Sequence, residues 1–196
     1  MNPYVIITAP HAQCNNNNPI RNCDILAKNA ANILYSYIKC QKCLLIGNRY
    51  RSDIDLNRPV SRQTDFRLKL TSTITNIMKD NYRPIFLLDV HSFPTEIYGN
   101  YEVIILDNTK YPDSNNTYTY RLCSILHEAG IICTKYQGIP QNDIVAEGNY
   151  YHLLAPLIEF HETLTIPRVH YICTIISQWI NTELNHHLSR LNDLNY

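Results

Sequence analysis

The chain of 196 residues is long enough for one domain with a sizeable core and short for two. Its 17 basic and 17 acidic residues cancel, so no overall charge favours nucleic acid, and no apolar stretch is long enough for a membrane span. Seven cysteines, in a chain whose first expected strand follows Met1 too closely for a signal peptide, predict reduced thiols in a cytoplasmic protein.

The hydrophobic periodicity predicts strands and helices that alternate along the chain. The expected strands lie at about 4–9, 43–46, 84–90, 101–106, 131–133 and 156–160. The expected helices lie at about 24–39, 62–80 and 116–129, and from about 167 onward. Residues 136–152 are predicted to form a long loop that makes one wall of a site, because long loops in compact domains are usually functional. The alternation predicts a single α/β domain over 1–196, with a mostly parallel sheet covered on both faces.

Three of the expected strands run into a polar side chain. The strand at 4–9 leads to His11, the strand at 84–90 leads to His91, and the strand at 156–160 carries Glu159. In open α/β sheets, ligands bind outside the carboxyl ends of the strands. Neutral imidazole binds zinc, and a catalytic zinc has three protein ligands and one open position. His11 and His91 are therefore candidate zinc ligands, the alternative for each being a hydrogen-bonded structural histidine.

Two residues are candidates for the third ligand. Cys14 follows His11 by three residues, and a thiolate binds zinc. Asp24 begins the first expected helix, where the helix dipole favours a carboxylate, although an N-terminal cap is its ordinary role there. We favour Asp24, because a carboxylate leaves a hydrolytic zinc more Lewis acidic than a thiolate does.

Two carboxylates suit other roles in a hydrolytic site. Glu159 lies within an apolar strand, where a carboxylate is costly to bury unless it is paired or functional. Such surroundings raise a carboxyl pKa toward neutrality, as a general base requires. Asp89 precedes His91 by two residues and shares its face of the strand, so it suits a carboxylate that orients the imidazole. A buried structural role is the alternative for Asp89.

The segment 49–59 places three arginines and two aspartates in one turn-rich connection. Arg58 suits bidentate binding of a substrate carboxylate, with Asn57 beside it. Arg51 suits polarisation of the scissile carbonyl. Tyr150, in the predicted long loop, is a further substrate-binding candidate. The alternative is a charged loop that only meets solvent.

Five motifs follow one another along the chain: Thr8-Ala9-Pro10-His11-Ala12, Arg51 with Asp55-Leu56-Asn57-Arg58-Pro59, Leu87-Leu88-Asp89-Val90-His91-Ser92, Lys135-Tyr136-Gln137-Gly138 and Leu157-Ile158-Glu159. In this order they resemble the N-formylglutamate amidohydrolase family, which is related to the zinc carboxypeptidases. The likeness extends over about residues 5–162 and implies a three-layer α/β/α sandwich around a mixed sheet.

The resemblance also implies a set of functional residues. It implies that Asn57 and Arg58 hold a substrate carboxylate and that Glu159 activates water. Cys14 stands where the carboxypeptidases have a glutamate, three residues after the first histidine. The zinc ligands implied are two histidines and one acidic residue, here His11, His91 and Asp24.

The sequence thus predicts a zinc-dependent amidohydrolase or carboxypeptidase-like enzyme. Its substrate would be a small acylated amino acid or peptide that carries a carboxylate. The alternative is a catalytically inactive relative that acts as a binding or scaffold module. A nucleic-acid enzyme has the least support, because basic and aromatic residues are not interleaved and the zinc-deaminase signature is missing.

Overall fold

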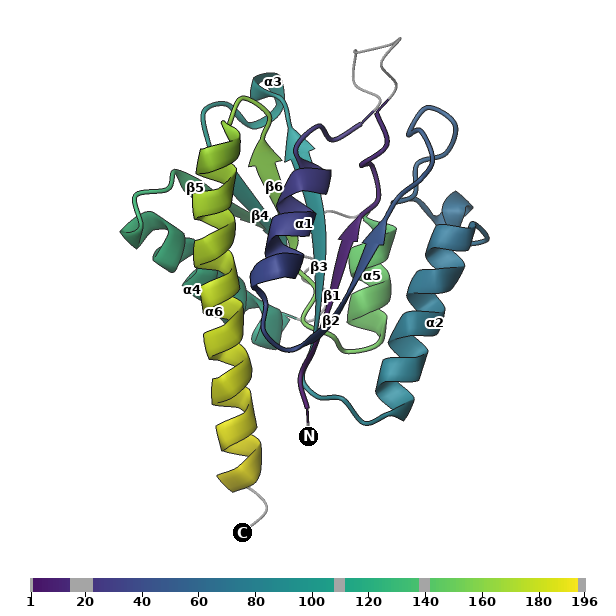
Figure 1. Ribbon diagram of the computed structural model, residues 1–196, viewed down its shortest axis with the longest axis vertical. Helices are drawn as coiled ribbons and strands as arrows, with labels where there is room; N and C mark the ends of the chain where they lie inside the picture. The colour runs from purple at the N-terminus through teal and green to yellow at the C-terminus, as the bar shows by residue number, and fades with distance from the viewer. Residues whose placement is uncertain (1, 15–22, 108–111, 138–141, 194–196) are drawn as a thin grey trace.

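The computed structural model describes residues 2–14, 23–107, 112–137 and 142–193, which form an α/β domain (Figure 1). The strands are β1 (Tyr4–Ala9), β2 (Gln41–Ile46), β3 (Ile85–Phe93), β4 (Val103–Asp107), β5 (Cys133–Gln137) and β6 (Leu157–His161). The helices are α1 (Ala27–Tyr37), α2 (Asp65–Lys79), α3 (Thr95–Tyr98), α4 (Pro112–Glu128), α5 (Asp143–Tyr150) and α6 (Ile166–Asp193), with a 3₁₀ turn at Pro59–Ser61. The predicted alternation of strands and helices is confirmed.

The strands form one mixed sheet in the order β2-β1-β3-β6-β4-β5. The first four strands of this order are mutually parallel, whereas β4 runs antiparallel to β6, and β5 is parallel to β4. The predicted mostly parallel sheet is therefore confirmed. Because β1, β3 and β6 are neighbours that run in one direction, their carboxyl ends meet at one edge, which lies at the top of Figure 1.

Helices cover both faces of the sheet and make the sandwich that the resemblance implies. Alternate residues of each central strand enter different cores, since side chains in a strand point alternately to opposite faces. Val5 and Ile7 share one core with α1, α4 and α6, where Leu34 of α1 is buried. Ile6 shares the other core with α2 and α5, where Leu70 of α2 is buried. Figure 1 shows α1 and α6 in front of the sheet.

Part of the segment 136–152 is helical, so the prediction of one long loop is wrong. Its residues 138–141 lie outside the described part of the chain, and α5 follows. The Asn142 side chain accepts a hydrogen bond from the amide of Val145 at 2.9 Å and so caps the helix. Gly148 lies where α5 contacts the sheet: a Cβ there would be 2.7 Å from atoms of Ala155 and Leu87. This glycine therefore permits the close packing of α5 on its neighbours.

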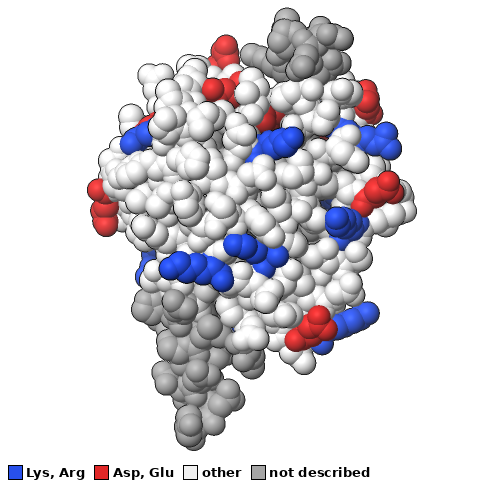
Figure 2. Space-filling view, in the orientation of Figure 1, with Lys and Arg blue, Asp and Glu red and all other residues white. Residues whose placement is uncertain are grey.

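The helices bear on whether the chain spans a membrane, and the charged side chains bear on whether a patch of one charge lies on the surface. Of the helices that the structure describes, none combines the length and the apolar character that crossing a membrane requires. Figure 2 shows one face of the molecule, on which Lys and Arg are spread out with Asp and Glu among them. This face therefore offers no single extended field of one sign.

Candidate active site and metal centre

His11, Asp24 and His91 converge at the carboxyl edge of the sheet. His11 follows β1, His91 lies in the neighbouring strand β3, and Asp24 precedes α1. All three are buried, and their ligand atoms lie within 4.8 Å of one another. Asp24 Oδ2 lies 2.6 Å from His91 Nδ1 and 3.4 Å from His11 Nδ1. The structure thus gathers the two histidines with the favoured third ligand, and both imidazoles direct the same nitrogen, Nδ1, toward one carboxylate.

The opposite nitrogen of each imidazole contacts a second carboxylate. His11 Nε2 lies 2.8 Å from Asp55 Oδ1, and His91 Nε2 lies 3.0 Å from Asp89 Oδ2. Metal-binding histidines in proteins almost always donate their other N–H to such a group, which fixes the tautomer and the ring orientation. The contact of Asp89 is the one predicted from its spacing. Asp55 was assigned no role from the sequence, although it lies in the same charged segment as Arg51 and Arg58.

The buried charges of the cluster stabilise one another. Burial alone would raise the pKa of Asp24, but the charge of His91, its 2.6 Å hydrogen bond and the nearby ring of His11 outweigh burial and lower that pKa below its usual range. Burial alone would lower the pKa of His91. The charges of Asp89 and Asp24, and the hydrogen bonds to them, outweigh burial and raise that pKa well above the ordinary imidazole value. Asp89 stays ionised because His91, Asn142 and Thr8 hold its pKa low against complete burial.

The donor set fits a divalent transition metal. His11 Nδ1 is buried and has no hydrogen-bond partner in the part of the chain that the structure describes. With the proton of His11 on Nε2, toward Asp55, this Nδ1 presents a lone pair toward Asp24. Two imidazole nitrogens and one carboxylate are a ligand set that catalytic zinc uses. The orphaned nitrogen is the feature that a cation would satisfy.

Glu159 and Arg51 lie beside this cluster. Glu159 is opposite His91 in the β3–β6 register, so the two side chains share a face and an edge of the sheet. Asp24, Arg51, His91 and Glu159 all line one cavity of about 440 Å³. Burial, the largest cause, together with the nearby charges of Asp24 and Asp89, raises the pKa of Glu159 to about 7, against the opposing effect of His91 and Arg51. A carboxyl group that titrates near neutral pH suits proton transfer.

The remaining candidates lie in different places. Arg51 Nη1 lies 3.6 Å from Asp24 Oδ1 at the cavity, and Arg58 Nε lies 3.3 Å from Asp55 Oδ2. Asn57 is buried behind the site, with its Nδ2 2.7 Å from His91 Nε2. The structure therefore places Asn57 against the ring of a ligand candidate, and its predicted contact with a substrate carboxylate stays a prediction.

The structure places Tyr150 away from the cavity, and its predicted contact with a substrate stays a prediction. Tyr150 ends α5 and is 73% exposed. The chain that follows it meets the beginning of β3, where the Leu154 amide donates to the Ile85 carbonyl at 3.1 Å. The site lies at the other end of β3, because α5 runs back along the sheet.

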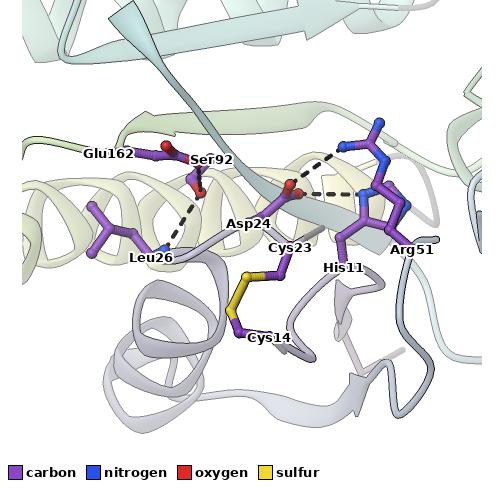
Figure 3. The surroundings of a disulfide bond; sticks show 8 residues. All are labelled: His11, Cys14, Cys23, Asp24, Leu26, Arg51, Ser92 and Glu162. Atoms are coloured by element: carbon purple, nitrogen blue, oxygen red, sulfur yellow. Dashed lines mark hydrogen bonds and ion pairs between the residues drawn. A yellow bond between two sulfur atoms is a disulfide. The ribbon is translucent and has the colours of Figure 1, made fainter. Parts of the chain in front are cut away.

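The cysteines correct two expectations, that all seven thiols are reduced and that Cys14 could be a metal ligand. Cys14 and Cys23 form a disulfide bond (Figure 3), so the expectation of seven reduced thiols is wrong, and five cysteines are free. The bonded sulfur of Cys14 is no thiolate, which removes it as the alternative metal ligand. Asp24 is not a helix cap either: α1 has Leu26 at its N-cap position, and the Asp24 carboxylate faces the histidines. The cytoplasmic location stays a prediction.

Comparison with known proteins identifies the class of fold. No family model and no curated protein matches the chain. Among solved structures, the fold is that of amidohydrolases and carboxypeptidase-like proteins, and the resemblance drawn from the motifs is confirmed at this level.

Three of the similar structures illustrate the likeness. The N-formylglutamate amidohydrolase of Ralstonia eutropha JMP134 has a TM-score of 0.71 at 12% identity, over 93% of this chain and 94% of that one. The gene product Atu2144 of Agrobacterium tumefaciens has a TM-score of 0.65 at 14% identity, over 97% and 90%. The cell shape determinant protein Csd4 of Helicobacter pylori, described as a D,L-carboxypeptidase, has a TM-score of 0.63 at 9% identity, over 94% of this chain and 51% of Csd4. Identities this low establish the fold alone.

Proposed function

We propose that this protein is a zinc-dependent hydrolase that cleaves an amide bond in a small acylated amino acid or peptide bearing a carboxylate. One observation carries the proposal: two buried imidazoles direct Nδ1 toward one carboxylate, and each is backed at Nε2 by a further carboxylate. A purely structural pair of histidines does not require this duplicated arrangement. The fold shared with an amidohydrolase and a carboxypeptidase agrees with the proposal.

His11, Asp24 and His91 would hold the zinc ion. Bound there, zinc supplies Lewis-acid chemistry to the cavity. Asp55 accepts the Nε2 proton of His11, so that Nδ1 of this ring would present a lone pair to the cation, and Asp89 lies 3.0 Å from Nε2 of His91. Asn142 and Thr8 in turn hold Asp89, with hydrogen bonds of 2.9 and 2.7 Å.

Glu159 would act as the general base and then as the general acid. Burial raises its pKa above the ordinary carboxyl value, which suits a group that would accept a proton from the attacking water and pass that proton to the leaving amine. Arg51 lines the same cavity and remains partly exposed, which allows its guanidinium to donate to the scissile carbonyl or to a substrate carboxylate. The other lining residues carry no second guanidinium or ammonium group in the described part of the chain.

The charge of the cavity narrows the substrate class. Besides Asp24 and Glu159, two more carboxylates line it, those of Glu96 and Glu162. Glu162 accepts a hydrogen bond from Ser92 Oγ at 3.4 Å, and burial with the charge of Asp24 raises its pKa. A substrate that carries an ammonium group as well as its carboxylate would complement these acids, so peptides with a free amine belong in the test panel.

The test begins with the metal content of protein purified without chelators, with His91→Ala as the variant and His170→Ala as its matched control. His170 is an exposed histidine on α6. We expect about one zinc per chain in the wild type and in the control, and a loss in His91→Ala. A wild type without stoichiometric transition metal would refute the proposal.

Hydrolysis of N-acylated amino acids and short peptides is then measured for the wild type and for Glu159→Gln. We expect Glu159→Gln to keep the metal and lose at least a hundredfold in kcat, as general acid–base catalysis implies. Equal activities in the two proteins would remove Glu159 from the reaction. Stoichiometric zinc with no cleavage of any substrate by the wild type would favour the alternative, an inactive binding module.

A further inference from the structure

The disulfide bond joins the two chain segments that carry two of the three metal-ligand candidates. Cys14 follows His11 by three residues, and Cys23 immediately precedes Asp24. The Cα atoms of the two cysteines are 5.0 Å apart. Figure 3 shows the disulfide beside Asp24, whose carboxylate points to His11 and Arg51.

Asp24 depends on this link more than the two histidines do. His91 lies within a central strand and His11 comes two residues after another, so the sheet fixes both. Asp24 lies outside the sheet and ahead of α1. Its amide donates to the His11 carbonyl at 2.9 Å, and its carbonyl accepts from the Ala27 amide at 3.1 Å. The covalent bond one residue away adds the strongest restraint on where its carboxylate lies.

The disulfide is also within reach of a reductant. Cys14 and Cys23 are each only partly buried, and Cys23 lines the cavity. In contrast, Cys123, Cys133 and Cys173 are buried thiols within the core. A small dithiol entering the cavity would therefore meet this bond directly.

We propose that the Cys14–Cys23 disulfide is a positioning element for Asp24, through which the redox state of the protein sets its affinity for the metal. This inference rests on the proposed metal site. In the reductive step, a dithiol reductant breaks the S–S bond, gives its two protons and two electrons to Cys14 and Cys23, and leaves as its own disulfide. Freed of the bond, the segment that holds Asp24 samples more conformations, and the ligand set loses its preorganisation.

The test is a competition for Zn²⁺ between a chromogenic chelator and three forms of the protein: the oxidised wild type, the wild type reduced by a dithiol, and Cys14→Ser/Cys23→Ser. We expect the reduced protein and the serine variant to bind Zn²⁺ 10- to 100-fold more weakly than the oxidised protein, the range typical of losing a group that orients a ligand. Cys40→Ser/Cys43→Ser is the matched control and should leave the affinity unchanged. Far-ultraviolet circular dichroism of each form checks that it is folded, and the reduced wild type provides a route without mutation.

The outcomes separate the two proposals. Equal affinities of the oxidised and reduced forms would overturn the positioning role while leaving the metal site intact. Tighter binding by the reduced wild type but not by the serine variant would also overturn it, because the thiolates would then be ligands. Thiolate-to-metal charge-transfer bands with Co²⁺ would identify that case. An oxidised wild type that binds no Zn²⁺ would refute the proposed function, and with it this inference.

Discussion

The buried guanidinium of Arg67 should be among the most costly side chains to remove from this fold. Arg67 is 2% exposed and joins α2 to α5: its Nη2 lies 2.9 Å from Asp143 Oδ2 and 2.6 Å from Glu147 Oε2. Its Nη1 also donates to the Leu56 carbonyl at 3.2 Å, in the segment that carries Asp55 of the site. Arg67→Met keeps much of the apolar stem and removes the charge that compensates two carboxylates.

The magnitude follows from what remains after the change. Removing one partner of a buried ion pair costs about 3–5 kcal/mol, because a buried charge is left uncompensated. Here Asp143 keeps Arg62, and Glu147 keeps the hydroxyl of Thr71, so the lower end, about 3 kcal/mol, is expected. For a domain of this size, that corresponds to a fall in Tm of roughly 6–12 °C.

Arg62→Met is the matched control, because Arg62 contacts the same carboxylate from the surface. Its Nη2 lies 2.5 Å from Asp143 Oδ1, but its side chain is 61% exposed. An exposed pair contributes at most about 1 kcal/mol, and Arg67 remains to neutralise Asp143. Urea unfolding, followed by circular dichroism and by Trp179 fluorescence, gives both free energies of unfolding. If Arg67→Met lowers the free energy of unfolding no more than Arg62→Met does, burial does not strengthen the ion pairs of this cluster.

Three further predictions concern packing, metal and pH. Gly148→Ala should destabilise the fold by about 1–3 kcal/mol in urea unfolding, because the new Cβ would lie 2.7 Å from Leu87 and Ala155; an unchanged midpoint would contradict this packing. Zinc at a hundred times its dissociation constant should raise the free energy of unfolding of the wild type by about 2.7 kcal/mol, measured by thermal unfolding, and should leave His91→Ala unchanged. In metal-free protein, the pKa of Glu159 is raised from 4.5 to about 7, so the folded state binds this proton more tightly than the unfolded state does. The contribution of Glu159 to the free energy of unfolding is therefore full below pH 4.5 and is lost as the pH rises through 7. Glu159→Gln should therefore be more stable than the wild type by roughly 3 kcal/mol at pH 8 and by little at pH 4.5, and equal differences at both pH values would show that Glu159 does not titrate in this range.

The parts of the fold that the sequence predicts are those with a strong local signal. The apolar runs before His11 and His91 are long and rich in β-branched residues, so they mark buried strands whatever surrounds them. Parallel strands then bring their carboxyl ends to one edge, which is why two histidines about eighty residues apart in the sequence could be paired. Glu159 follows by the same argument, because β6 lies next to β3.

The parts that were missed depend on tertiary contacts. Gly148 lies in the segment that was expected to be a loop, and its role is visible only where α5 packs on Leu87. The reversed direction of β4 is decided by its pairing with β6, and no local pattern encodes it. The pairing of Cys14 with Cys23 and the contact of Asp55 with His11 both require the loops at the sheet edge to be in place.

The electrostatics of the site explain why four carboxylates can surround two imidazoles. Asp24, Asp55, Asp89 and Glu159 lie at or beside the cluster, and without a metal His91 is held in its charged form by Asp24 and Asp89. A divalent cation at His11, Asp24 and His91 would carry two positive charges and so would balance more of the carboxylate charge than the one proton on His91 does. The imidazole of His91 must lose that proton before Nδ1 can act as a ligand, so metal and proton compete for the same atom. Metal uptake should therefore release protons, and the apparent affinity for the metal should rise with pH until His91 is neutral.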